Sequence, residues 1–282
     1  MPAVNPSASG EVRKVLRKVA VRVGAFVLIV WIVALLIQNV YAYAAAGGLT
    51  LLALGVAIWV YVYLRKGSAV ANILQSADVS TAQGRKEAMS KLADKADRGD
   101  VAALFAKANL LMHEDPRKAL EQLEQINLTK VMAPIADEAR GQRAMIHLIL
   151  GETDKARPLA DAIDLSRHDQ IKSRAALAAV VSEAWARSGL GKRANETLDL
   201  YDADSAELSE IRPQLFRSRA FAAAAQNDVK RMRYALRRLK AANPQLLAGF
   251  VQKKVHPLLE KEARQMLMQS GAVPKKMIRQ RM

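Results

Sequence analysis

The fold is decided by four short segments that align without gaps: Asp115-Pro-Arg-Lys-Ala119, Glu152-Thr-Asp-Lys-Ala156, Leu190-Gly-Lys-Arg-Ala194 and Asp228-Val-Lys-Arg-Met232. Their last residues are 37, 38 and 38 positions apart, and each follows a Lys or Arg. Four positions further on, on the same face of a helix, stand Leu123, Ala160, Leu198 and Leu236. A near-constant period of this length indicates an array of helical repeats.

Turn-forming residues precede or open each of the four segments: Glu114-Asp115, Gly151, Gly189 with Gly191, and Asn227-Asp228. The residues twelve positions before the segment ends are mostly small and belong to a preceding helix: Lys107, Ala144, Ser182 and Ala220. Each unit is therefore expected to be a helical hairpin. Beyond Ser68 the chain shows little of the period-two alternation that strands need, so we predict an all-α fold.

This pattern resembles the tetratricopeptide repeat family over roughly residues 69 to 245. In that family a small residue near the start of the second helix lies about twelve positions after a small residue of the first. Ala119, Ala156 and Ala194 match this position, whereas Met232 replaces the small residue in the fourth unit. The period also exceeds the roughly 34 residues of the family. The resemblance implies an α-solenoid of about four hairpins, with these four residues packing the repeats. An irregular helical bundle is the alternative.

A 42-residue run from Val23 to Leu64 contains no Asp, Glu, Lys or Arg and is flanked by basic residues. A bilayer is crossed by roughly 20 helical residues, so the run predicts a hairpin of two transmembrane helices near 19–37 and 42–64. Gln38-Asn39 is the expected turn. Basic flanks remain in the cytoplasm, which places both termini and the repeats there. The layout is similar to that of bacterial inner-membrane proteins with an N-terminal anchor and cytoplasmic tetratricopeptide repeats, and no targeting signal for another compartment is present, so we expect a bacterial inner membrane. A cleaved signal peptide ending near Ala42-Tyr43-Ala44 is the alternative.

Four parts of the chain follow from these patterns. We predict a basic N-terminal segment at 1–18, a transmembrane helical hairpin at 19–66, a tetratricopeptide-like repeat domain at 67–245, and a basic capping helix with a tail at 246–282. A long helix is expected to begin at Pro244, with an interruption or bend at Pro257, and to cover the exposed apolar end of the array.

The net charge of +16 is concentrated in the last quarter of the chain. Residues 67–211 hold 19 basic and 23 acidic residues, whereas residues 212–282 hold 17 and 3. The densest group is a possible contact surface for an anionic partner: Lys230, Arg231, Arg233, Arg237, Arg238 and Lys240. Anionic lipid or an acidic protein could bind it, or it could simply be a solvated face. Nucleic acid is the least favoured partner, since no recognised binding module accompanies the charge.

No set of residues predicts a reaction, a metal site or a cofactor. Cysteine is absent, and the four histidines have no partner histidine at helical spacing (His113, His147, His168, His256). Neither a phosphate-binding glycine loop nor a nucleophile elbow is present. We therefore expect no enzyme and no cofactor. A pocket holding two or more of His113, His147 and His168 beside carboxylates would reverse that expectation.

Repeat arrays present extended surfaces to other proteins. We therefore predict a membrane-anchored protein-interaction scaffold or assembly factor. The alternative is a structural or regulatory subunit of a membrane complex, with the hairpin as its main binding element. The concave face of such an array comes mostly from the first helix of each hairpin, which makes the candidate partner-binding residues Lys107, Gln142, Arg143, Arg174 and Arg217.

Overall fold

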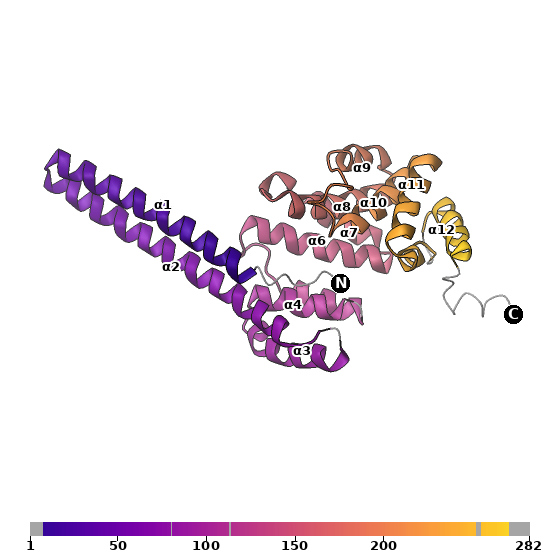
Figure 1. Cartoon of the computed structure of the whole chain (residues 1–282), viewed down its shortest axis with the longest axis horizontal. Helices are drawn as coiled ribbons and strands as arrows, with labels where there is room; N and C mark the ends of the chain where they lie inside the picture. The colour runs from indigo at the N-terminus through magenta and orange to yellow at the C-terminus, as the bar shows by residue number, and fades with distance from the viewer. Residues whose placement is uncertain (1–7, 80, 113, 252–254, 271–282) are drawn as a thin grey trace. The chain divides into compact units, whose positions relative to one another are not determined.

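The structure is a computed structural model that describes residues 8–79, 81–112, 114–251 and 255–270. These residues form twelve α-helices, two 3₁₀ helices and no strand, as Figure 1 shows. The predicted all-α fold is therefore confirmed. The chain divides into two compact units, Met1–Leu110 and Leu111–Met282. The end of the predicted C-terminal tail (271–282) and the start of the basic N-terminal segment (1–7) lie outside the described residues.

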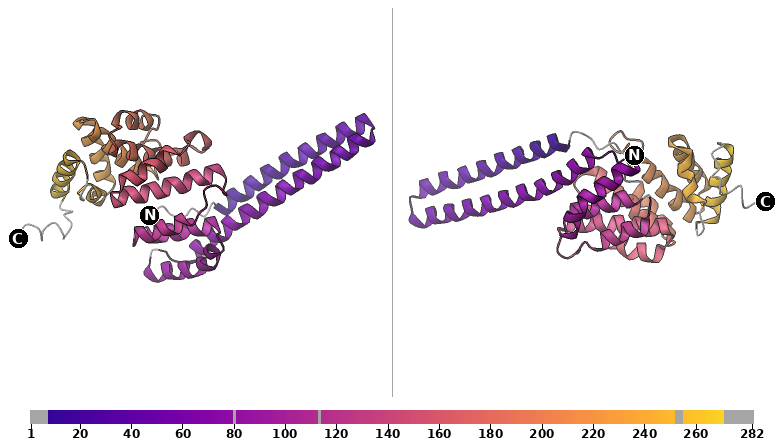
Figure 2. Two further views of the ribbon diagram at one scale, coloured as in Figure 1. Left: turned by 180° about the vertical axis from the view of Figure 1, so that it is seen from behind. Right: turned by 90° about the horizontal axis from the view of Figure 1, so that it is seen from below.

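Unit 1 begins with two long antiparallel helices, α1 (Ala8–Ile37) and α2 (Val40–Ser76), which lie side by side in Figures 1 and 2. They turn at the predicted residues. Gln38 adopts a left-handed conformation with φ 50°, and the side chain of Asn39 accepts a hydrogen bond from the Tyr41 amide at 2.9 Å. Trp31 Nε1 donates to Thr50 Oγ1 at 3.1 Å and joins the two helices.

The membrane prediction for residues 19–66 needs correction. Among the residues that the structure describes, no helix is both long and apolar enough to cross a membrane. The inner-membrane localisation, with its cytoplasmic orientation, rested on the two predicted spans and is withdrawn. Many described apolar side chains of the two helices are nevertheless exposed, Leu36 and Val40 most of all.

Unit 1 continues with α3 (Ala82–Asp97) and α4 (Val101–Leu111). Thr81 caps α3 by accepting a hydrogen bond from the Gly84 amide at 3.0 Å. A Cβ at Gly84 would lie 2.0 Å from the carbonyl oxygen of Asp78, so only glycine permits this close approach of the chain. Asp100 caps α4 in a similar way, through the amides of the next helical residues.

Unit 2 is built from successive helix pairs. It begins with α5 (Pro116–Glu124), capped by Asp115. The pairs are α6 (Ala133–Leu150) with α7 (Thr153–Asp161), α8 (Ile171–Arg187) with α9 (Gly191–Leu198), and α10 (Arg212–Ala225) with α11 (Val229–Ala242). Each pair turns on a residue of positive φ: Gly151, Gly189 and Asn227. A short 3₁₀ helix, η1 (Leu165–Arg167), lies between α7 and α8.

The core of unit 2 is rich in alanine, which lets helices approach closely. Helix α8 contacts α6, α7, α9 and α10 and has eleven buried residues. At the positions that the sequence aligns, the side chains are fully buried: Ala119, Ala156, Ala194 and Met232. Gly191 marks another tight contact, because a Cβ there would lie 2.8 Å from the Ala225 Cβ and 3.1 Å from the Ala222 carbonyl oxygen.

Two arginines satisfy the free carbonyl groups at the ends of short helices. Arg143 in α6 donates from Nη2 to the carbonyl oxygens of Leu123, in the last turn of α5, and Ile126, just after it, at 2.5 and 2.8 Å. In α10 the equivalent donor is Arg219, which donates to the carbonyl oxygens of Leu198, the last residue of α9, and Tyr201, just after it, at 3.2 and 2.6 Å. The last carbonyls of a helix have no partner within it, so each arginine ties a first helix to the second helix of the pair before it.

The C-terminal part of unit 2 differs in part from the long helix predicted to begin at Pro244 and to be interrupted or bent at Pro257. The segment from Pro244 is a 3₁₀ helix, η2 (Pro244–Phe250), and a separate α-helix, α12 (Pro257–Gln269), begins at Pro257. Pro257 occupies the first turn of α12, where proline is tolerated because the amide there needs no helical partner. Leu247, Phe250, Leu259 and Leu267 are buried in the core of unit 2.

Candidate partner-binding cleft

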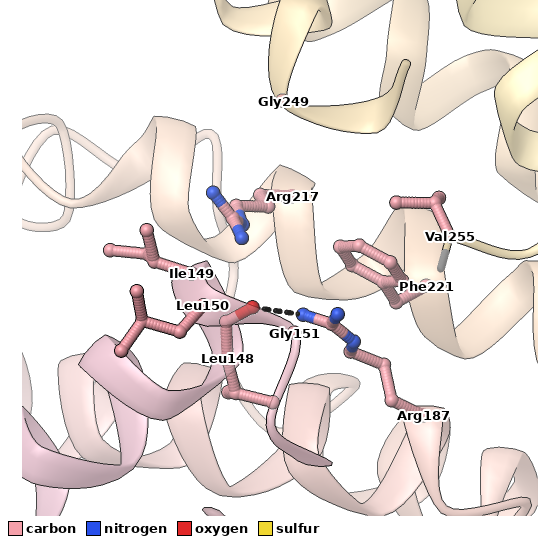
Figure 3. Close-up of a pocket in the computed structure, with 9 residues that line it drawn as sticks. All are labelled: Leu148, Ile149, Leu150, Gly151, Arg187, Arg217, Phe221, Gly249 and Val255. Atoms are coloured by element: carbon pink, nitrogen blue, oxygen red, sulfur yellow. Dashed lines mark hydrogen bonds between the residues drawn. The ribbon is translucent and has the colours of Figure 1, made fainter. Parts of the chain in front are cut away.

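A cleft in unit 2 lies between the carboxyl ends of α6 and α8, helix α10 and the segment before α12 (Figure 3). One cavity of about 240 Å³ is lined by Leu148, Ile149, Leu150, Gly151, Arg187, Arg217, Phe221, Gly249 and Val255. A second cavity of about 480 Å³ shares Arg187, Phe221 and Val255, and adds Thr153, Ala186, Gly189, Ala225 and His256. We refer to both together as the arginine cleft.

Two arginines share one carboxylate at this cleft. Arg217 donates from Nε and Nη2 to the two carboxylate oxygens of Glu183, both at 3.0 Å. Arg187 donates from Nη1 to Glu183 at 3.2 Å and to the carbonyl oxygen of Leu148 at 2.7 Å. Figure 3 shows the hydrogen bond from Arg187 to the carbonyl oxygen of Leu148, and the guanidinium of Arg217 across the cleft from Gly249. The three charged groups together carry one net positive charge.

The pKa values of the two arginines shift in opposite directions. Loss of water around the Arg187 guanidinium lowers its pKa, against the attraction of Glu183, and the neighbouring positive charge of Arg217 lowers it further. Arg217 has the opposite shift, because the charge of Glu183 raises its pKa despite partial burial. Both groups remain charged at neutral pH, since an arginine in a protein is not deprotonated.

An aromatic ring stands beside both cations. The Cζ atoms of Arg187 and Arg217 lie 5.0 and 5.8 Å from the centre of the Phe221 ring, within the range of cation–π attraction. Phe221 also packs against Phe250 at a centroid distance of 5.2 Å. The Phe221 ring thus lies between the two arginines and the core, and the small part of it that remains exposed lines the cleft.

Local helical geometry explains how these side chains come together. Glu183 and Arg187 are four residues apart in α8, and Arg217 and Phe221 are four residues apart in α10. Residues at this spacing lie on one face of a helix. The two faces meet because α8 and α10 pack against each other.

The candidate partner-binding residues are distributed over both units. Arg217 lines the arginine cleft. Gln142 and Arg143 lie in α6, where Arg143 bonds the end of α5 as described above. Arg174 lies in α8, near the hydroxyl of Tyr201. Lys107 belongs to α4 in unit 1, partly buried. The structure therefore brings one of the five to the cleft.

Sequence reasoning missed three residues of the cleft: Glu183, Arg187 and Phe221. A signal was available, since Glu183 and Arg187 form an acid–base pair at helical spacing close to the buried stretch of α8. The pair looks like an ordinary exposed ion pair in the sequence, because nothing there shows that α10 covers it.

Three of the six basic residues predicted as a contact surface in α11 pair with acidic groups of the same unit. Arg233 donates to both carboxylate oxygens of Glu262 in α12, at 2.8 and 2.7 Å. Arg231 pairs with Asp199 and Asp228, and Arg238 pairs with Asp204. The other three residues of the group form no ion pair within the described part of the chain; they are Lys230, Arg237 and Lys240.

The histidines of unit 2 lie in separate surroundings. His147 Nδ1 is 2.9 Å from Glu152, and His168 Nε2 is 3.9 Å from the buried carboxylate of Asp137. Asp137 also pairs with Arg140 and Arg167. His147 and His168 do not line the arginine cleft, and His113 lies outside the described residues. No group of three potential metal ligands occurs within the ranges described.

Comparisons with protein-family models, curated proteins and solved structures gave no match. The cleft is therefore interpreted from its own geometry.

Proposed function

We propose that this chain is a protein-interaction scaffold and that the arginine cleft of unit 2 holds its partner. One observation carries the proposal: helices α6, α8 and α10 all contribute residues to the walls of the cleft, and they are the first helices of three successive pairs. Such a surface joins neighbouring pairs into one continuous binding face, which is how helical repeat arrays recruit other proteins.

We further propose that the helix pairs form a tetratricopeptide-like solenoid. Arg143 and Arg219 support this, because they make the same contact in two pairs and lie 76 positions apart in the sequence, twice the 38-residue spacing. The complete burial of Ala119, Ala156 and Ala194 at aligned positions gives independent support.

Site-specific photo-crosslinking tests the scaffold proposal. A benzophenone amino acid replaces Ile149, which lines the cleft, in the full chain expressed in its native host. The matched control carries the same group at Lys192 in α9, whose side chain is largely exposed on a second helix. We expect a discrete protein adduct from position 149, and none at position 192, in nuclease-treated cells. Equal labelling from both positions, or no adduct, would contradict the proposal.

The exposed apolar side chains of α1 and α2 favour a second candidate function. In this alternative the helical hairpin is the main binding element, and the chain is a structural or regulatory subunit that packs the hairpin against apolar helices of another protein. A benzophenone group at Leu36, which is 79% exposed, separates the two candidates: adducts from Leu36 in the absence of adducts from Ile149 would favour the hairpin.

A further inference from the structure

The charge in the arginine cleft is incompletely balanced. Glu183 has to neutralise two guanidinium groups, and the side chains of Glu183 and Arg187 are only 6% and 9% exposed. A buried charge is costly unless it is paired. A single carboxylate between two cations leaves one positive charge at the cleft. The side chain of Arg217 is 34% exposed, so it is the cation of the pair that a further anion can reach.

One donor group of the arginine pair faces open space. Arg217 binds Glu183 through Nε and Nη2, while no described residue accepts a hydrogen bond from its Nη1. On the opposite side of the cleft stands Gly249, and even a Cβ at that position would remain 3.8 Å from Nη1. The missing side chain of Gly249 thus leaves space in front of the outer edge of the Arg217 guanidinium (Figure 3).

Apart from its arginines, the cavity at Arg217 is lined by apolar residues and glycines, whereas the second cavity also contains Thr153 and His256. Phe221 and Val255 line both cavities, and the end of α6 contributes Leu148, Ile149 and Leu150. With about 240 Å³, the cavity at Arg217 is smaller than the roughly 300–1,000 Å³ that enclose drug-sized ligands. It fits one or two side chains of a larger partner better than a complete small molecule.

We propose that the arginine cleft binds an acidic segment of a protein partner, in which an Asp or Glu stands beside a large apolar residue. The partner carboxylate accepts a hydrogen bond from Arg217 Nη1 and neutralises the excess charge of the arginine pair. The apolar neighbour packs against Phe221 and Val255. This inference rests on the proposed scaffold function and specifies the kind of segment that the scaffold recognises.

A peptide selection tests the inference directly. The full chain is immobilised and used to select binders from a random dodecapeptide library on phage, and the selected peptides are synthesised with fluorescein for anisotropy measurements. We expect enriched peptides to share an Asp or Glu next to Leu, Ile, Phe or Met. Replacing that acidic residue by its amide should weaken binding at least about tenfold, as expected for the loss of one charge-assisted hydrogen bond.

Variants of the protein assign the binding to the cleft. Gly249→Leu fills the space in front of Arg217 and leaves the pairing with Glu183 intact, so it should also weaken binding at least about tenfold. Lys192→Leu is the matched control and should bind like the wild type, because Lys192 is exposed in α9 and does not line the cleft. Arg217→Gln removes the charge itself. Circular dichroism of each variant shows whether it remains folded.

The outcomes separate this inference from the scaffold function. If the peptides bind Gly249→Leu with the same affinity as the wild type, they do not bind in the cleft, and the inference is wrong. If the enriched peptides lack acidic residues, the partner does not bind through a carboxylate, and the inference is also wrong. If no peptide is selected although Ile149 captures a partner by crosslinking, the inference fails and the scaffold function stands. If both experiments fail, both proposals fall.

Discussion

Arg217 in α10 binds Glu183 in α8 side-on, with two hydrogen bonds of 3.0 Å that match its Nε and Nη2 groups to the two carboxylate oxygens. This geometry fixes both the charge and the shape of the cleft, because a bidentate pair holds the planar guanidinium in one orientation. The same carboxylate binds Arg187. Glu183 is thus the group on which the folded form of the cleft depends.

Glu183→Gln should destabilise unit 2 by about 3–5 kcal/mol, the cost of removing one partner from a buried ion pair. The substitution leaves the buried Arg187 and the partly exposed Arg217 close together without their shared anion. Urea unfolding followed by circular dichroism measures the change. Glu196→Gln is the matched control, because Glu196 lies 4.0 Å from Lys192 on an exposed surface and should change the stability by less than about 0.5 kcal/mol. Equal effects of the two substitutions would show that the Glu183 pairing is not buried in solution.

Close helix packing makes a second prediction. Gly191→Ala should lower the free energy of unfolding by about 1–3 kcal/mol, because the new methyl group overpacks the contact with Ala225 and the Ala222 carbonyl. Ala194→Leu should cost a similar amount at the neighbouring buried position. Gly249→Ala serves as the control, since its methyl group meets only the guanidinium of Arg217 at 3.8 Å. Unchanged thermal unfolding of Gly191→Ala would contradict the packing of α9 against α10.

The arginines that bond the ends of the short helices make a third prediction. Arg143→Met and Arg219→Met should each cost about 1–3 kcal/mol, because buried carbonyl groups lose a charged donor. Arg237→Met is the control, since Arg237 is exposed in α11 and forms no ion pair within the part of the chain described. Hydrogen exchange should show faster opening at the end of α5 in the first variant and at the end of α9 in the second. Uniform changes throughout unit 2 would contradict this local role.

The pairing of α11 with α12 predicts a pH dependence. Hydrogen bonds from Arg233 lower the pKa of Glu262 below its ordinary value of about 4.5. A group whose pKa is lowered by folding stabilises the native state above its ordinary pKa, and this contribution is lost as the pH falls through the lowered value. Glu262→Gln should therefore be less stable than the wild type at pH 7, and the difference should disappear as the pH falls through the lowered pKa of Glu262. A stability difference that stays constant with pH would contradict the pairing.

The sequence predicts the turns of unit 2 because local chemistry sets them. Gly151, Gly189 and Asn227 occupy left-handed conformations that glycine and asparagine adopt most readily. The position of the turn in the α1–α2 hairpin was predicted for a similar reason, at the polar pair Gln38-Asn39. The membrane assignment of that hairpin, which rested on the length of the uncharged run and on its basic flanks, was wrong, because no helix among the described residues is long and apolar enough to cross a membrane.

The arginine cleft could not be predicted in the same way. Glu183 and Arg217 are separated by 34 positions, and only the packing of α8 against α10 shows that they meet. The pairing of the basic residues of α11 could not be predicted from the sequence either. These residues read as a surface for an external anion, yet Arg231, Arg233 and Arg238 have acidic partners on other segments of unit 2. Long-range pairing of this kind leaves no periodic pattern in the sequence.

The most direct test of the central claim is hydrogen–deuterium exchange of the full chain, with and without the partner captured at Ile149. If the arginine cleft holds the partner, the amides at 148–151 and 187–190 should exchange more slowly in the complex, because these helix ends line the cleft. Slower exchange confined to α1 and α2, with no change at the cleft, would contradict the account and favour the helical hairpin as the binding element.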